Sequence, residues 1–172
     1  PVDHATFEKI KKNVDAKAFY PKLPEYIDLD EYIKNDGYKI YNSICNGDIS
    51  ADSAVTTLEA SELKGLGGAG FPAGRKWRIL REQHAPRLLA VNIDEGEPGT
   101  FKDRYSFESD PHRFFEGMLI ASKVVGIDKI YIYLRDEYPA VKTIMEQEIE
   151  KIKKTFNNIP DIEMRRGAGA YI

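Results

Sequence analysis

The chain has 172 residues, a formal net charge of -3 at pH 7 and a single cysteine. Its length suffices for one buried core, its slightly acidic charge balance argues against nucleic-acid binding, and the lone cysteine excludes an internal disulfide. No apolar run reaches the roughly 18 residues of a membrane-spanning helix, and no signal-peptide pattern opens the chain. We therefore expect a cytoplasmic protein of a reducing compartment, without direct membrane insertion.

The first fifty residues have the pattern of short helices joined by irregular segments. One helix is expected near residues 3–14 and a second over residues 29–35, where a turn signal follows it. Neither brings enough apolar residues for a core of its own. We therefore predict that residues 1–50 are an N-terminal extension or adaptor, laid over a domain formed by residues 51–172.

From residue 51 onward, helical and strand patterns alternate. Helices are expected up to residue 61 and over residues 73–83, 110–126 and 139–154, and strands over residues 87–93, 130–134 and 161–164. Strands that alternate with helices imply right-handed crossovers and a parallel sheet. We predict an α/β fold: a three-layer, Rossmann-like, mostly parallel sheet with helices on both faces.

The most informative motif spans residues 65–77 and reads Gly-Leu-Gly-Gly-Ala-Gly-Phe-Pro-Ala-Gly-Arg-Lys-Trp. Such a glycine-rich loop lets its backbone approach a bulky anion, and its N–H groups can cradle phosphate. A dinucleotide fingerprint is disfavoured because the residues before the loop predict a helix and not a strand. A P-loop is disfavoured because no Ser or Thr follows Lys76. A loop that merely joins two helices remains an alternative.

A second polar motif follows the apolar run 88–91 and reads Asn-Ile-Asp-Glu-Gly-Glu-Pro-Gly-Thr-Phe-Lys-Asp-Arg over residues 92–104. Open α/β sheets place ligands at the carboxyl ends of their strands. Asn92 can donate and accept hydrogen bonds there, while Asp94 and Glu95 can accept from ribityl hydroxyls or ring N–H groups. The alternative for Asn92 and Asp94 is that they make the turn at the strand end.

The two blocks together resemble the FMN-containing, NADH-oxidising subunit of respiratory complex I. They are equally similar to the diaphorase (beta) subunits of NAD-dependent formate dehydrogenases and NAD-reducing hydrogenases. Residues 166–172, Arg-Gly-Ala-Gly-Ala-Tyr-Ile, resemble a third block of this family, cut within the motif. We therefore expect an N-terminal fragment of such a subunit, and Leu66, Arg75 and Gly96 favour the formate dehydrogenase and hydrogenase branch.

This resemblance implies an FMN site with two walls, one from the glycine loop and one from the strand end. Phe71 and Glu97 match family positions near bound NADH, although Phe71 as a core residue and Glu97 as a solvent-facing one are the alternatives. Ile79 stands where the family has a second aromatic residue, so stacking from that side is not expected. The implied FMN positions are Gly65, Gly67, Gly68, Lys76, Asn92, Asp94, Glu95 and Tyr171.

The resemblance further implies an electron-input module that oxidises NADH by hydride transfer to FMN, or runs the reverse reaction. Electrons would pass to iron–sulfur clusters in partner subunits of a larger complex on the cytoplasmic or matrix side of a membrane. Because FMN carries the chemistry, no catalytic side chain is predicted. The alternatives are a non-catalytic scaffold module that binds flavin or nucleotide, and a subunit of an ion-translocating flavoprotein complex.

No metal site is expected within these residues. His4, His84 and His112 have no cysteine or carboxylate companions at ligand spacing, so they are expected to be solvated or to cap helices. In the resembling family a 4Fe–4S cluster is held in a later part of the chain, which is where we expect it.

Overall fold

The core of the fold is a parallel sheet of three strands. The computed structural model describes residues 23–66 and 69–169, and its sheet consists of β1 (Leu88–Ile93), β2 (Lys129–Leu134) and β3 (Asp161–Arg166) in the order β1-β2-β3. The register pairs Ile93 with Leu134 and Leu134 with Arg166. The carboxyl ends of all three strands therefore meet at one edge, and the prediction of a parallel α/β fold is confirmed.

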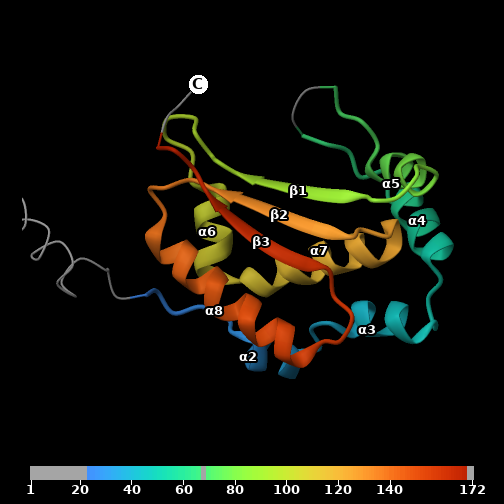
Figure 1. Cartoon of the computed structure of the whole chain (residues 1–172), viewed down its shortest axis with the longest axis horizontal. Coiled ribbons are helices and arrows are strands. Elements are labelled where there is room, and N and C mark those ends of the chain that lie inside the picture. Colours follow the sequence, from blue (N-terminus) through green and yellow to red (C-terminus); the bar gives the residue numbers. More distant parts are fainter. Residues whose placement is uncertain (1–22, 67–68, 170–172) are drawn as a thin grey trace, which may run out of the picture.

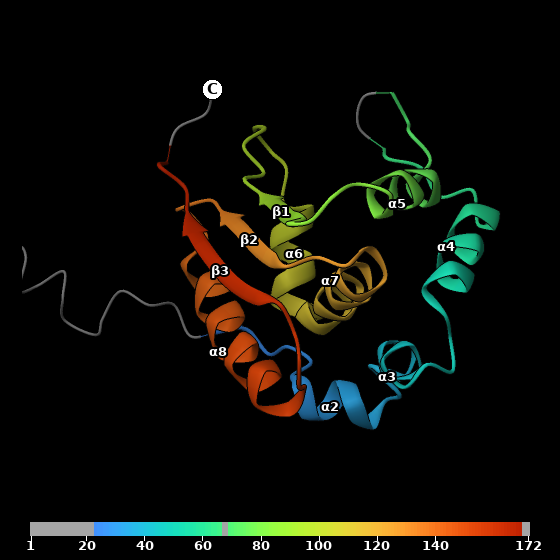
Figure 2. The same cartoon turned by 45° about the vertical axis from the view of Figure 1, so that its right-hand side comes forward.

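The helices pack against one face of this sheet. Figure 1 shows the sheet as one layer, α6 to α8 beneath it, and α2 and α3 below these. In Figure 2, α3, α4 and α5 follow one another up the side of α7. The helices are α2 (Leu29–Lys34), α3 (Lys39–Asn46), α4 (Ala51–Ala60), α5 (Ala73–Arg81), α6 (Lys102–Ser109), α7 (Pro111–Val125) and α8 (Pro139–Thr155).

The other face of the sheet carries no helix among the described residues, which differs from the three-layer arrangement expected from the sequence. The alternation along β2 gives the reason. Ile130, Ile132 and Leu134 are buried against the helices, whereas Tyr131 and Tyr133 point the other way and are more exposed. Two outward positions of β2 are tyrosines, whose hydroxyl groups can stay in contact with solvent on an uncovered face.

Local capping signals fix the longest predicted helix at both ends. Asp110 accepts a hydrogen bond from the backbone N–H of Arg113 at 3.2 Å, Pro111 opens α7, and the helix ends at Gly126. An N-cap carboxylate followed by proline at the first helical position satisfies the free N–H groups of a helix start without long-range help. This is why the bounds of α7 could be predicted from the sequence.

The segment before residue 50 shares the main core. Leu29, Tyr38 and Tyr41 belong to the same buried cluster as Ile132 of β2 and Val141 of α8. Helix α2 packs on α8, and α3 packs on α7. The described part of the extension is therefore held by the helices that cover the sheet, in keeping with the absence of a core of its own.

A buried polar network ties this segment to α7 and α8. The Tyr38 hydroxyl lies 2.8 Å from Nδ1 of His112, whose Nε2 lies 2.8 Å from Glu148. Glu148 also accepts hydrogen bonds from the Tyr26 hydroxyl and the Leu29 N–H, and both His112 and Glu148 are completely buried. The expectation that His112 is solvated or a helix cap was wrong, because a buried carboxylate and a hydroxyl satisfy both ring nitrogens.

Candidate functional site

The glycine loop is closed at its base by the backbone. Lys64 and Pro72 form an antiparallel bridge, the Gly65 N–H donates to the Phe71 carbonyl at 3.2 Å, and the Ala73 N–H donates to the Leu63 carbonyl at 2.8 Å. The loop therefore leaves and rejoins the fold at one point, at the start of α5. Two predicted FMN positions, Gly67 and Gly68, lie outside the described residues, as does Tyr171.

Helix α5 begins where the loop ends and lies close against α4. A Cβ atom added to Gly74 would stand 2.5 Å from the backbone nitrogen of Glu59 and 2.8 Å from its Cα, so only glycine allows this approach. Arg78 fastens the pair from the side with two hydrogen bonds to the Glu59 carboxylate, at 2.8 and 2.6 Å. The position of the loop is thus fixed by α4.

Lys76 lies in the first turn of α5 and is exposed. No acidic partner for its ammonium group occurs within residues 23–66 and 69–169. A lysine cation that has no acidic partner among the described residues, next to a glycine-rich loop, suits an anionic ligand such as a phosphate.

Phe71 is an exposed residue of the loop and not a core residue. Its side chain is 45 % exposed, and the Arg75 guanidinium lies 5.8 Å from the ring centroid. The alternative that Phe71 pins the loop to the core is therefore wrong. Its ring is available to stack on a planar ligand, and Ile79, at the place of the family's second aromatic residue, is 43 % exposed.

The strand-end loop is built from two consecutive turns. The side-chain oxygen of Asn92 accepts a hydrogen bond from the Asp94 N–H at 2.9 Å, which leaves the Asn92 amide nitrogen for a ligand. The Thr100 N–H donates to the Glu97 carbonyl at 3.2 Å across Pro98 and Gly99. Gly99 has φ 83°, so this is a type II turn, which needs glycine at that position. Glu97 is exposed at its start.

The side chain of Glu95 is buried, whereas those of Asn92 and Glu97 are exposed. The Glu95 side chain is only 1 % exposed and accepts hydrogen bonds from the backbone N–H groups of Asp103 and Arg104, at 2.9 and 3.2 Å, and from the Tyr138 hydroxyl at 2.9 Å. Burial opposes ionisation of Glu95, but these hydrogen bonds outweigh it and lower the pKa of the carboxyl group. The carboxylate caps the start of α6.

Two residues that contact Glu95 were not predicted from the sequence. Arg135 follows β2, and Tyr138 directly precedes α8; the Arg135 guanidinium donates to the Glu95 carbonyl and lies 5.0 Å from the centroid of the Tyr138 ring. Both lie about 40 residues from Glu95 in the chain. The one signal that could have indicated them is their position just beyond the carboxyl end of a parallel strand.

The two loops stand on the same side of the sheet. In Figures 1 and 2, the described ends of the glycine loop and the loop after β1 both rise from the face opposite the helices, near opposite ends of β1. The predicted positions Gly65 and Phe71 lie in the glycine loop, and Lys76 lies in the helix that follows it. Asn92 lies near the end of β1, and Asp94, Glu95 and Glu97 lie in the loop after it. The open face of β1 lies between them.

A small cavity adjoins the residues that hold Glu95. It has a volume of about 70 Å³, lies near the ends of β2 and β3, and is lined by Arg135, Tyr138, Lys142, Glu146 and their neighbours, but by none of the residues predicted from the sequence. No group of three or more His, Cys, Asp or Glu side chains in the described ranges is arranged to hold a metal ion. Among the helices described, none has the length and apolar character needed to cross a membrane.

A parallel α/β sheet with a glycine-rich loop and a polar strand-end loop over one open face is typical of nucleotide- and flavin-binding domains. Within this class the comparison with known families is specific: residues 58–172 match the family described as the Nuo51 FMN-binding domain. The chain belongs to this family.

Relatives of the chain occur in two kinds of complex. It is 42 % identical over 160 residues to an NADH-quinone oxidoreductase subunit of Aquifex aeolicus, covering 88 % of this chain and 37 % of that protein. It is 36 % identical over 137 residues to the alpha subunit of the NAD-reducing hydrogenase HoxS of Cupriavidus necator, covering 72 % and 22 %. The chain thus spans between 22 % and 37 % of the length of these two relatives.

A solved structure confirms the fold. The crystal structure of an NAD+-reducing [NiFe]-hydrogenase in the H2-reduced state superposes with a TM-score of 0.70 and 30 % sequence identity. The match covers 98 % of this chain and 32 % of the hydrogenase chain.

Proposed function

We propose that this chain is the FMN-binding part of an NADH-oxidising electron-input subunit, which can also run in reverse as an NAD-reducing one. One observation carries the proposal: the glycine loop, which leads into α5, and the loop that follows β1 stand on the same open side of the sheet, in a chain that belongs to an FMN-binding family. The curated relatives named above act on NADH or NAD in complexes of several subunits.

The residues present fit an anionic, ring-bearing cofactor. Lys76 and the N–H groups of the glycine loop would hold the FMN phosphate or an electron-rich ring edge from one side. The Asn92 amide and the Asp94 carboxylate would bind ribityl hydroxyls or ring N–H groups from the other. When bound, FMN supplies the acceptor for a hydride and releases the electrons singly. The side chains bind and orient; none is required as a proton donor for hydride transfer.

Phe71 and Glu97 would bind the substrate, NADH. The exposed Phe71 ring can stack on the nicotinamide or the adenine of NADH, and the Glu97 carboxylate can accept a hydrogen bond from a hydroxyl or amide. Onward transfer would go to iron–sulfur clusters, one in a later part of the same subunit and others in partner subunits. The proposal places the module on the cytoplasmic or matrix side of the complex.

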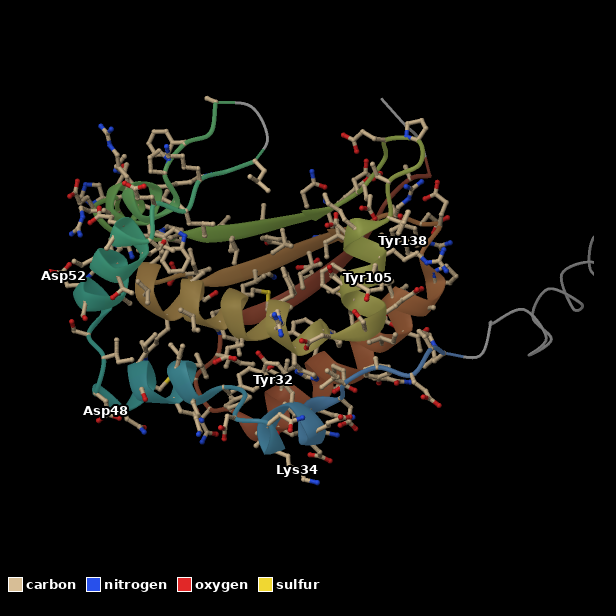
Figure 3. The ribbon with its side chains drawn as sticks, turned by 180° about the vertical axis from the view of Figure 1, so that it is seen from behind. Tyr32, Lys34, Asp48, Asp52, Tyr105 and Tyr138 are labelled. Carbon is tan, nitrogen blue, oxygen red and sulfur yellow. The ribbon has the colours of Figure 1, made fainter. Side chains whose placement is uncertain are left out.

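Flavin content and turnover of the full-length protein test this function. We expect the purified protein to show a flavin absorption band and to reduce an artificial acceptor with NADH. The Lys76→Ala variant should lose the band, while Lys34→Ala should keep it, since Lys34 lies at the far end of the molecule from both loops (Figure 3). Bound flavin without turnover would support a scaffold module, and a folded protein without flavin would contradict the proposal.

A further inference from the structure

The carboxylate of Glu95, a residue assigned to the flavin site by resemblance, is enclosed by donors of the protein itself. Its Oε1 accepts the Asp103 N–H, and its Oε2 accepts both the Arg104 N–H and the Tyr138 hydroxyl. In addition, the Lys102 ammonium nitrogen lies 3.9 Å from Oε1. With 1 % of the side chain exposed, this carboxylate faces protein donors and not the open side of the sheet.

The backbone of Glu95 is held as firmly as its side chain. Its φ of 38° lies in the left-handed region, which residues with a Cβ rarely adopt. The Arg135 guanidinium donates to the Glu95 carbonyl, and the Arg135 backbone N–H donates to the Ile93 carbonyl at 3.1 Å. The two ends of this unusual backbone conformation are thus fastened to the residue that follows β2.

Tyr138 contacts both the side chain of Glu95 and the side chain of Arg135. Its hydroxyl binds the Glu95 carboxylate, and its ring lies under the Arg135 guanidinium, 5.0 Å from centroid to cation. Figure 3 shows Tyr138 beside α6 and below the loop that follows β1. Burial and the hydrogen bond to Glu95 raise the pKa of Tyr138, so its hydroxyl remains a donor at neutral pH.

We propose that Arg135 and Tyr138 are positioning residues of the flavin site, and that Glu95 meets the flavin through its main chain and not through its carboxylate. The proposal rests on the proposed function, because it concerns the same site. Arg135 and Tyr138 set the backbone of residues 94–97, and this backbone decides which N–H and carbonyl groups point toward the cofactor. In an environment of low dielectric, the orientation of such dipoles changes both the affinity for FMN and its reduction potential.

Three variants of the full-length protein test this proposal: Tyr138→Phe, Glu95→Gln and the double variant. The readouts are the FMN dissociation constant, from quenching of FMN fluorescence by apoprotein, the flavin midpoint potential and the melting temperature. Removing one hydrogen bond to a charged acceptor should weaken FMN binding by about three- to tenfold in Tyr138→Phe. The midpoint potential should shift as well. Tyr105→Phe is the matched control, since Tyr105 is 68 % exposed on α6.

The double variant separates two roles for Glu95. If its carboxylate acts only through the loop, the effects of Tyr138→Phe and Glu95→Gln are not additive, since both weaken the same group of hydrogen bonds around residue 95. If the carboxylate touched the flavin, Glu95→Gln would weaken binding while Tyr138→Phe did not. Arg135→Met should resemble Tyr138→Phe, Arg135→Lys should recover part of the affinity, and Arg113→Met is the exposed control, with a side chain that is 83 % exposed.

The outcomes that overturn the proposal are distinct from failure of the function itself. Variants that lower only the melting temperature, with unchanged FMN affinity and potential, would show a purely structural role and refute the proposal. A wild-type protein that binds no FMN would refute the proposed function and this proposal together. A wild-type protein that binds FMN while the Tyr138 and Arg135 variants match their controls would refute this proposal alone.

Discussion

Tyr38 and His112 are 74 positions apart in the sequence, and the Tyr38 hydroxyl lies 2.8 Å from the Nδ1 atom of His112 inside the core. Because Glu148 accepts from the other ring nitrogen, the network assigns the proton of a neutral imidazole to Nε2, and the Tyr38 hydroxyl donates to Nδ1. Burial lowers the pKa of His112, even though Glu148 acts in the opposite direction.

This lowered pKa predicts a loss of stability in mild acid. The histidine of the unfolded chain takes up a proton as the pH falls below about 6.5, whereas folded His112 stays neutral to lower pH. The free energy of unfolding should therefore fall from pH 7.5 to pH 5.5, by at most about 1.4 kcal/mol per pH unit from this group. In urea unfolding followed by circular dichroism, His112→Gln should lose this part of the pH dependence, and the exposed His84→Gln should keep it.

Removing the carboxylate at the centre of the network should be more damaging than any pH change. Glu148 accepts from His112, Tyr26 and the Leu29 N–H, so Glu148→Ala leaves several buried donors without an acceptor. We expect a loss of about 3–5 kcal/mol in the free energy of unfolding. Glu150→Ala, on the exposed side of the same helix, should change it by less than about 0.5 kcal/mol. Equal effects of the two substitutions would contradict the network.

Replacing glycine by alanine should have opposite effects on stability at Gly74 and at Gly117. In Gly74→Ala the new Cβ meets the backbone of Glu59, so α5 must move away from α4, and we expect a destabilisation of about 1–3 kcal/mol. In Gly117→Ala, within α7, nothing lies within 4 Å of the added Cβ, and the helix should gain about 0.5–1 kcal/mol. Thermal unfolding of both variants gives the measurement. A neutral Gly74→Ala would show that α4 and α5 do not depend on this close approach.

If Phe71 stacks on NADH, its replacement affects the substrate more than the cofactor. Phe71→Leu should raise KM for NADH by about two- to tenfold, the range expected for loss of one aromatic contact, with the flavin content unchanged. Phe71→Tyr keeps the ring and should restore the wild-type KM. Steady-state kinetics of the full-length protein decide this, and a fall in kcat at constant KM would assign Phe71 to another role.

The helices that could be predicted from the sequence are those with local signals. Asp110, Pro111 and Gly126 mark both ends of α7, and apolar periodicity revealed α8. Helices α3 and α6 were not predicted. Helix α6 is largely polar, and its cap is supplied by Glu95, seven residues before its first residue. Tyr38, the N-cap residue of α3, has a φ of 62°, and its side chain gives no cap. Contacts of this kind leave no pattern in the local sequence.

More of the candidate site than of the surrounding fold could be predicted from the sequence, but not all of it. Its two loops were indicated by composition and by resemblance, and the exposure of Phe71 and Lys76 agrees with binding roles. The partners Arg135 and Tyr138 were not predicted, because they reach the site only through the pairing of β1 with β2. The burial of Glu95 likewise depends on a helix that the sequence did not indicate.

The bridge between Lys64 and Pro72 gives the glycine loop an independence that the strand-end loop lacks. A segment whose two ends are joined can change in length or composition without displacing the helices on either side, since each added residue costs only a small increment of closure entropy. Insertions between Gly65 and Phe71 should therefore leave the packing of α4 on α5 intact and impair only the phosphate cradle proposed for this loop. Between Asn92 and Lys102, where Glu95 ties the backbone to α6, insertions should also disturb the fold.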